Sequence, residues 1–516
     1  MFLRLPRRQL EPPVAPRCIR CPSRPARAKA ETVTSPEYDV IVLGAGAVGE
    51  NVADRAVQGG LSAVLVESEL VGGECSYWAC TPSKALLRSS QVLRAAHRVP
   101  GAAQAITGEL DVSAVLARRD YFTNNWSDAG QIRWAERAGI DVLRGHGRIT
   151  GPKEVTVTLA DGSTRILTAR HAVTIATGSD ALIPDIDGLR EAKPWTSREA
   201  TSVKTVPSSL AIIGGGVVAT EMATVYASFG TTVTVIARGD LLAGLEPFAG
   251  ELVTEALRER GVSVLPHTET KRVTRSADGV AIEIGDGTVV TAHEVLVATG
   301  RSPRTTDIGL ETIGLTPGDW IPTDDTMRAP GFDWLYAAGD VTRRALLTHQ
   351  GKYQARAAGD VIVARATGAL VSDSAWGTHV ATADHEAVPQ VVFTEPEVAS
   401  VGLTARAAVA TGYAIRSVDY EIGHVSGASL RADGYKGTAR MVVDEKRGVV
   451  IGVTFVGPDV SELLQAATIA IVGEVPISRL WHAVPAYPTV NEIWLRLLET
   501  YGRPASQQIS DGATHA

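Results

Sequence analysis

Residues 40–49 read Val-Ile-Val-Leu-Gly-Ala-Gly-Ala-Val-Gly, an apolar strand that runs into a glycine-rich turn and the start of a helix. Gly44 permits a tight turn, Gly46 lets the backbone approach a diphosphate, and Gly49 allows the helix to pack closely. The next apolar run ends at Glu67, where a carboxylate can accept hydrogen bonds from ribose hydroxyls. This stretch therefore predicts a βαβ unit that binds a dinucleotide.

The same pattern returns at residues 210–219, Leu-Ala-Ile-Ile-Gly-Gly-Gly-Val-Val-Ala, with Gly214, Gly216 and Ala219 in the three key positions. A second nucleotide site is expected there. The strand that follows ends at Arg238, where a site specific for NAD would carry an acid. An arginine can pair with the 2′-phosphate of NADPH, which favours NADPH; the alternative is an NADH site that lacks its acid.

Two further short strands end in Ala-Thr-Gly, one at Thr177 and Gly178 and the other at Gly300. These matched ends suggest crossings between two nucleotide domains. Residues 334–340 form another short strand, and the carboxylate of Asp340 at its end can reach the ribityl chain of a flavin. The alternative role for Asp340 is an ordinary helix N-cap.

The composition is that of a globular protein with two or three domains. Of the 516 residues, 45% are apolar and 21% are charged, and the net charge is −7. This charge argues against nucleic acid or an anionic membrane as a partner, and no apolar run reaches the roughly 18 residues of a membrane span. We expect a cytoplasmic protein that acts on small molecules.

The four cysteines form two close pairs, Cys18 with Cys21 and Cys75 with Cys80, which is not the framework of a secreted protein. Residues 72–84 read Gly-Gly-Glu-Cys-Ser-Tyr-Trp-Ala-Cys-Thr-Pro-Ser-Lys. Two cysteines five residues apart near a helix start can reach disulfide distance if the helix is distorted, and the helix N-terminus favours a thiolate. Two structural thiols are the alternative. Cys18 and Cys21 lack a second pair of ligands, so no metal site is expected.

Taken in order along the chain, these motifs resemble the flavoprotein disulfide reductases related to dihydrolipoamide dehydrogenase, glutathione reductase and mercuric reductase. The resemblance covers about residues 38 to 500. It implies FAD on the first nucleotide unit, NADPH or NADH on the second, and a homodimer built through the C-terminal domain. The motifs that carry it are the Gly44 and Gly214 turns, GGxCxxxxCxPSK, Ala298-Thr299-Gly300-Arg301, Ala338-Gly339-Asp340 and Phe393-Thr394-Glu395-Pro396-Glu397.

The resemblance also implies roles for individual residues. Cys80 would be the flavin-proximal thiolate, Cys75 the interchange thiol, and Lys84 with Glu221 an ion pair beside the flavin and the nicotinamide. Electrons would pass from the nicotinamide to FAD, to the Cys75–Cys80 disulfide and then to an acceptor. The residues expected to bind the cofactors are Gly44, Gly46, Gly49, Glu67, Lys84, Thr177, Gly178, Asp340, Gly214, Gly216, Ala219, Arg238 and Gly300.

The residues expected to serve the electron acceptor differ from those of the family. Most disulfide-reducing members carry, in the partner subunit, a histidine five residues before a glutamate; here Glu492 is present and Tyr487 replaces the histidine. A tyrosine, with a pKa near 10, is a poor base at neutral pH. His482 is an alternative proton donor. The acceptor therefore stays open among a disulfide or small thiol, a quinone and Hg(II), and a redox sensor without turnover is a further alternative.

The predicted fold class is α/β, with two Rossmann-like nucleotide-binding domains, for FAD and NAD(P), and a C-terminal α+β dimerisation domain. Residues 1–37, rich in arginine and proline, are expected to be a disordered extension, with a transit peptide as the alternative. The predicted divisions are 1–37 extension, 38–200 and 322–385 FAD domain, 201–321 NAD(P) domain, 386–503 dimerisation domain and 504–516 tail.

Overall fold

The computed structural model describes residues 36–503, and the first nucleotide domain is built on a seven-stranded sheet. The strand order is β3-β2-β1-β6-β5-β4, with β16 also paired to β6; β4 and β5 are antiparallel additions to a parallel core. The strands are β1 Glu37–Leu43, β2 Ala63–Glu67, β3 Asp141–Arg144, β4 His146–Gly151, β5 Glu154–Thr158, β6 Thr164–Ile175 and β16 Leu335–Ala337.

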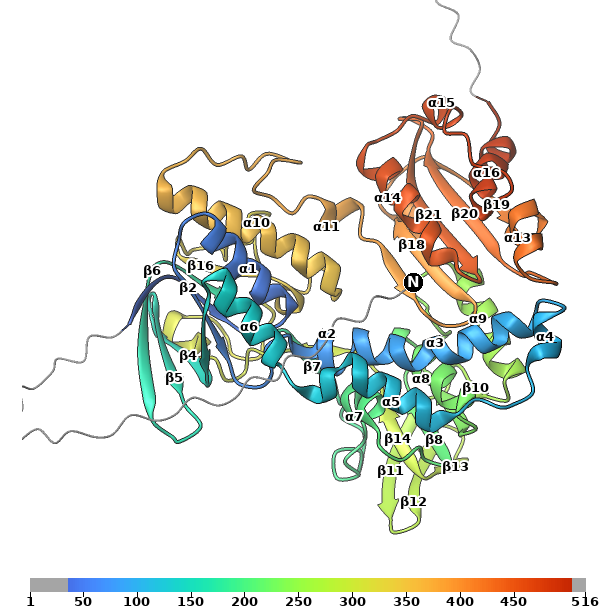
Figure 1. Ribbon diagram of the computed structural model, residues 1–516, viewed down its shortest axis with the longest axis horizontal. Helices are drawn as coiled ribbons and strands as arrows, with labels where there is room; N and C mark the ends of the chain where they lie inside the picture. The colour runs from blue at the N-terminus through green and yellow to red at the C-terminus, as the bar shows by residue number, and fades with distance from the viewer. Residues whose placement is uncertain (1–35, 504–516) are drawn as a thin grey trace, which may run out of the picture. The chain divides into compact units, whose positions relative to one another are not determined.

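Two helices pack side by side on this sheet, α1 (Ala47–Gln58) and α10 (Thr348–Thr367) (Figure 1). Their backbones lie close, because a Cβ added at Gly359 of α10 would lie 3.2 Å from the carbonyl oxygen of Val52 in α1. This contact joins segments about 300 residues apart and sets the starts of both helices beside the carboxyl ends of the parallel strands.

The second nucleotide domain has a four-stranded parallel sheet in the order β10-β9-β8-β14, beside a three-stranded antiparallel sheet. Apolar residues of α8 are buried against the parallel sheet and also against α3 (Cys80–His97) of the first domain, where Leu87 packs in the same core as Tyr226. The elements are β8 Ser209–Ile213, α8 Val217–Ser228, β9 Thr232–Ile236, α9 Pro247–Glu259, β10 Ser263–Leu265, β11 Thr270–Ser276, β12 Gly279–Ile284, β13 Val289–Ala292 and β14 Glu294–Val297.

The two nucleotide domains are joined where β7 (Ser179–Ala181) pairs with β15 (Arg301–Pro303). Leu189 lies in the core of the second domain, whereas Leu310 lies in the core of the first. These contacts favour moving each predicted limit of the NAD(P) domain about twenty residues toward the N-terminus, and we propose this division.

The third domain is an antiparallel sheet of five strands in the order β17-β18-β21-β20-β19, covered by helices. Phe455 of the central strand packs edge-on against Trp494 of the last helix, with ring centroids 6.0 Å apart. This α+β architecture confirms the predicted fold class. Its elements include β17 Gln390–Val392, β18 Glu397–Gly402, β19 Ile415–Glu421, β20 Thr438–Asp444, β21 Val449–Gly457, α14 Leu464–Val472 and α16 Ile493–Tyr501.

Among residues 36–503, no helix combines the length and the apolar character needed to cross a membrane. The predictions made for residues 1–35, including the Cys18 and Cys21 pair, and for the tail from residue 504 lie outside the described residues.

Candidate functional site

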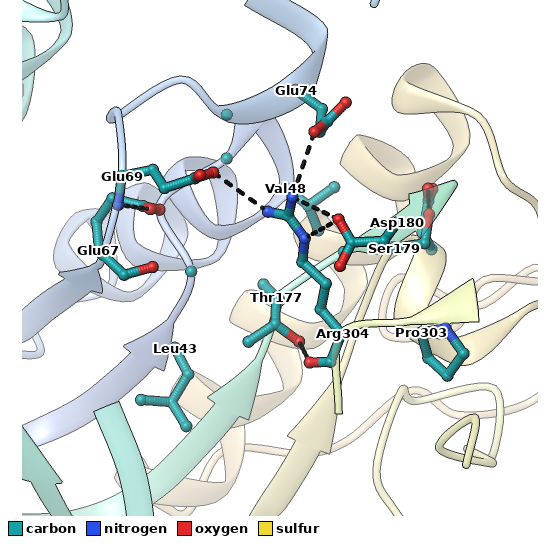
Figure 2. A pocket seen from close by; sticks show the side chains of 18 of the residues that line it. Leu43, Val48, Glu67, Glu69, Glu74, Thr177, Ser179, Asp180, Pro303 and Arg304 are labelled. Carbon is teal, nitrogen blue, oxygen red and sulfur yellow. Dashed lines mark hydrogen bonds and ion pairs between the residues drawn. The ribbon is translucent and has the colours of Figure 1, made fainter. Parts of the chain in front are cut away.

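A cavity of about 420 Å³ opens at the carboxyl ends of the first domain's strands. Figure 2 shows Glu67, Glu69 and Glu74 on one side of it and Asp180 and Arg304 on the other. Its lining includes most of the residues predicted for the first nucleotide: Gly44, Gly46, Glu67, Thr177, Gly178 and Asp340, together with Cys75 and Thr348.

The start of α1 has the form of a diphosphate site. Gly44 has φ +94°, and a Cβ there would lie 2.4 Å from the carbonyl oxygen of Ala176. A Cβ at Gly49 would lie 1.9 Å from the oxygen of Gly44, so only glycine lets the helix start this close to the turn. The N-cap, Gly46, makes no side-chain capping bond, which leaves the first backbone N–H groups of α1 for an anion. The cradle fits the diphosphate of FAD.

Two carboxylates at the cavity wall are held by neighbouring donors. The backbone N–H groups of Ala45 and Glu69 each donate to Glu67, at 2.7 Å. Asp340 accepts a hydrogen bond from the Ser179 hydroxyl at 2.6 Å. Both carboxylates thus have fixed positions and free lone pairs, as hydroxyl-binding groups of a ribose or ribityl chain require.

The two cysteines lie on either side of a break between two helices. Cys75 is in α2 (Gly73–Tyr77), and Cys80 is the first residue of α3 (Cys80–His97). Ala79, between them, has φ −131° and ψ −97°, which is not helical. Both side chains are thiols in the structure, and the distortion brings them within hydrogen-bonding reach of each other.

The surroundings make the two thiols unequal. The hydrogen bond from the Cys75 thiol, the Thr348 hydroxyl 3.3 Å away and the charge of Lys84 hold the pKa of Cys80 below its ordinary value, against the effect of burial. The same hydrogen bond and burial raise the pKa of Cys75. Cys80 is therefore the better thiolate, since a proton shared by the pair resides on Cys75.

One turn after Cys80, Lys84 forms an ion pair with Glu221 of α8, with the ammonium nitrogen 2.9 Å and 3.1 Å from the two carboxylate oxygens. Glu221 is buried and also accepts from the backbone N–H of Phe393 at 3.0 Å, and the Lys84 ammonium lies 4.8 Å from the Phe393 ring centroid. The three predicted domains thus meet at this pair.

The second glycine motif repeats the geometry of the first. Gly214 has φ +131°, with a Cβ clash against the oxygen of Ala298, and Gly216 caps α8 without a side-chain bond and faces open space. Ala219 is buried in α8 and Arg238 is exposed at the end of β9. Gly300 follows the Ala298–Thr299 segment that packs against Gly214, and its carbonyl accepts from the N–H of Leu182, next to β7.

The C-terminal candidates do not lie at the cavity. Tyr487 is 76% exposed, and His482 is exposed in the same loop. Glu492 is buried and accepts from the backbone N–H groups of Thr489 and Gly427, each at 3.2 Å. Its carboxylate therefore stabilises a loop within its own domain.

Several site residues did not emerge from the sequence. Thr348 at the start of α10 contacts Cys80, and Arg304, Arg198 and Glu74 form an ion-pair network at the cavity. Glu74 lies inside the cysteine motif and Arg304 directly after the Gly300 motif, so their positions beside known motifs were the available signal. Their pairing depends on tertiary contacts.

A second cavity, of about 590 Å³, has Lys84 in its lining. Residues of α3, of α5 (Val112–Phe122) and of the third domain line it, and Phe122 and Phe393 give it two aromatic walls. It is large enough for a flat organic molecule.

Two family descriptions match this chain. Residues 38–361 match the family described as Pyridine nucleotide-disulphide oxidoreductase, and residues 388–497 match its dimerisation domain.

Curated relatives are similar over nearly the whole chain. A mercuric reductase of Shigella flexneri is 32% identical, covering 92% of this chain and 83% of the relative. A mercuric reductase of Streptomyces lividans is 31% identical and covers 90% and 96%, and a dihydrolipoyl dehydrogenase of Chlorobaculum tepidum is 32% identical and covers 90% and 97%. Among solved structures, LpdA of Mycobacterium tuberculosis has a TM-score of 0.76 and 25% identity, covering 91% of this chain and 100% of LpdA.

Proposed function

This chain belongs to the pyridine nucleotide-disulphide oxidoreductase family. On that premise we propose that Cys75 and Cys80 deliver electrons to an acceptor that binds sulfur and needs no proton from a side chain of the protein. The protein is an FAD-dependent NAD(P)H oxidoreductase with a redox-active cysteine pair. When bound, FAD supplies hydride acceptance from the nicotinamide and two-electron exchange with sulfur. We propose NADPH as the preferred donor because Arg238 stands where an acid would exclude a 2′-phosphate.

The observation that supports this acceptor class is that the C-terminal loop carries a tyrosine where a proton-donating histidine is expected. Reduction of a disulfide releases a thiolate that must gain a proton, usually from a histidine. Here Tyr487 occupies that sequence position, and the Glu492 carboxylate is engaged by two backbone N–H groups. A soft metal ion, in contrast, binds two thiolates directly and needs no proton to stabilise them.

The proposed acceptor is therefore a soft divalent ion such as Hg(II). Hydride from NADPH would supply two electrons by way of FAD, and its proton would go to solvent. With these two electrons the bound ion becomes the element, and both metal–sulfur bonds break to leave Cys75 and Cys80 as thiolates, so no disulfide forms. The similar proteins include two mercuric reductases and one dihydrolipoyl dehydrogenase, and the replacement of the histidine by Tyr487 is our reason for favouring a metal-ion acceptor over a disulfide.

The test is NADPH oxidation by the holoenzyme with Hg(II) in excess small thiol, compared with lipoamide and glutathione disulfide. We expect turnover with Hg(II) that is lost in Cys75→Ser and Cys80→Ser, and at least 100-fold lower efficiency with the disulfides. Comparable efficiency with lipoamide would contradict the proposal.

A second candidate is quinone reduction, in which electrons leave without passing the cysteines. The cavity of about 590 Å³ beside Lys84, with Phe122 and Phe393 in its wall, favours it. Quinone turnover that is unchanged in both cysteine variants would support this function over the first.

We further propose that the chain acts as a homodimer in the cytoplasm. Its dimerisation domain exposes apolar side chains on α14, with Ile469 60% and Val472 40% exposed. Such a patch is typical of a surface that a second copy covers. The cytoplasm is the compartment in which a cysteine pair of this kind is kept reduced.

A further inference from the structure

The Arg304 side chain crosses the wall of the first cavity and ends among three carboxylates. Its guanidinium lies 2.6 Å from Asp180, 3.3 Å from Glu74 and 3.5 Å from Glu69 (Figure 2). Its backbone is held as well, since its carbonyl accepts from the Thr177 hydroxyl at 2.7 Å. Arg304 is therefore a fixed positive charge in the wall of the proposed flavin site.

Glu74 is the unusual member of this group. It precedes Cys75 directly, lines the cavity, and pairs with both Arg304 and Arg198. Its second oxygen is buried and accepts no hydrogen bond from any residue of the described range. A carboxylate held in this way depends on its arginine partners, because burying an unpaired charge is costly.

The charges within this ion-pair network do not balance. Glu69, Glu74 and Asp180 carry three negative charges, against two positive charges on Arg198 and Arg304. Hydrogen bonds from Arg198 and the charges of both arginines hold the pKa of Glu69 below its ordinary value, so this carboxylate stays ionised. A diphosphate bound at the start of α1 would add further negative charge to the same cavity.

We propose that Arg304 is an FAD-binding residue that screens the flavin diphosphate from the Glu69, Glu74 and Asp180 carboxylates. Its planar guanidinium suits both carboxylate and phosphate oxygens. Removing it would leave the three carboxylates of this ion-pair network with Arg198 as their one arginine partner, whereas neutralising Glu74 would free Arg304 for the phosphate. The two substitutions should therefore change FAD affinity in opposite directions. This inference rests on the proposed use of FAD but not on any acceptor.

The test measures the FAD dissociation constant by flavin fluorescence at low salt for the full chain and for Arg304→Gln, Glu74→Gln and the double variant. Arg272→Gln is the matched control, since Arg272 forms an exposed pair with Asp187 at 2.6 Å, remote from the cavity. We expect Arg304→Gln to weaken FAD binding at least fivefold, Glu74→Gln to tighten it, and the double variant to bind more tightly than Arg304→Gln.

A loss smaller than fivefold in Arg304→Gln, or a double variant as weak as Arg304→Gln, would overturn the proposal. If Arg304→Gln does not fold, Glu74→Gln decides the matter, because a fivefold weakening there contradicts the screening role. If the wild-type chain binds no FAD, the proposed function fails instead, which this measurement distinguishes.

Discussion

At the scale of single residues, the division of labour between the two cysteines follows from their neighbours. Thr348 and Lys84 surround Cys80, whereas Cys75 retains the shared proton. The spacing of the cysteines indicated a distorted helix start, but Thr348 lies 268 residues from Cys80 and no local pattern predicts that contact. The ion pair of Lys84 with Glu221 came from family resemblance, and the structure brings the two residues together.

A separate prediction at this scale concerns Glu50 and the pH dependence of stability. Burial raises its pKa to about 7, with Lys352 opposing the shift and Glu67 adding to it, and one carboxylate oxygen has no hydrogen-bond partner within residues 36–503. Because the folded-state pKa is raised, the stability associated with this group is complete below its ordinary pKa and is lost as pH rises through about 7.

Glu50→Gln should therefore stabilise the protein at pH 8 by roughly 3 kcal/mol and change its stability little near pH 4 to 5. Thermal unfolding of the holoenzyme across this range measures the effect. The exposed Glu109→Gln is the matched control and should show no such trend. An equal shift in Tm at all pH values would contradict the ionisation argument.

At the scale of elements, the glycine turns were the most predictable part of the site. Their rules are local: a positive φ at Gly44 and a close approach at Gly49 can be read from spacing alone. The predicted limits at residues 200 and 321 followed changes in local pattern. The contacts that divide the domains, such as those of Leu189 and Leu310, join remote segments and could not be read in the same way.

Gly49→Ala tests the turn directly. The added Cβ would meet the Gly44 oxygen at 1.9 Å and Val42 at 3.2 Å, so α1 must move away from the turn. We expect at least a tenfold loss of FAD affinity and a lower Tm. Gly130→Ala in α6 (Ala129–Ala138) has nothing within 4 Å of its new Cβ and should be tolerated. Equal FAD affinity and Tm in the two variants would contradict the claim that the space at Gly49 admits only glycine.

At the scale of the whole molecule, three domains meet around Lys84, Glu221 and Phe393. We propose that the electron path lies at this junction. The sequence predicted the domains through their order of motifs. The ion-pair network of Arg304 and Glu74 was missed because the two residues lie beside separate motifs and their pairing spans 230 residues.

If the exposed apolar side chains of α14 form the homodimer interface, a charged residue placed there should dissociate the dimer. Ile469→Arg should shift the protein toward monomer in sedimentation experiments, because a charge replaces an apolar side chain in the interface. Leu370→Arg, at a residue 92% exposed outside the dimerisation domain, is the matched control. A monomeric wild type, or an unchanged dimer in Ile469→Arg, would contradict this assignment.

The central claim is that Cys80 carries the thiolate through which electrons leave the flavin site. Anaerobic titration of the holoenzyme with NADPH, followed by absorption, tests it most directly. We predict a long-wavelength charge-transfer band that persists in Cys75→Ser and disappears in Cys80→Ser with full flavin occupancy. A charge-transfer band that survives in Cys80→Ser would contradict the account. So would the absence of the band from wild-type protein with full FAD occupancy.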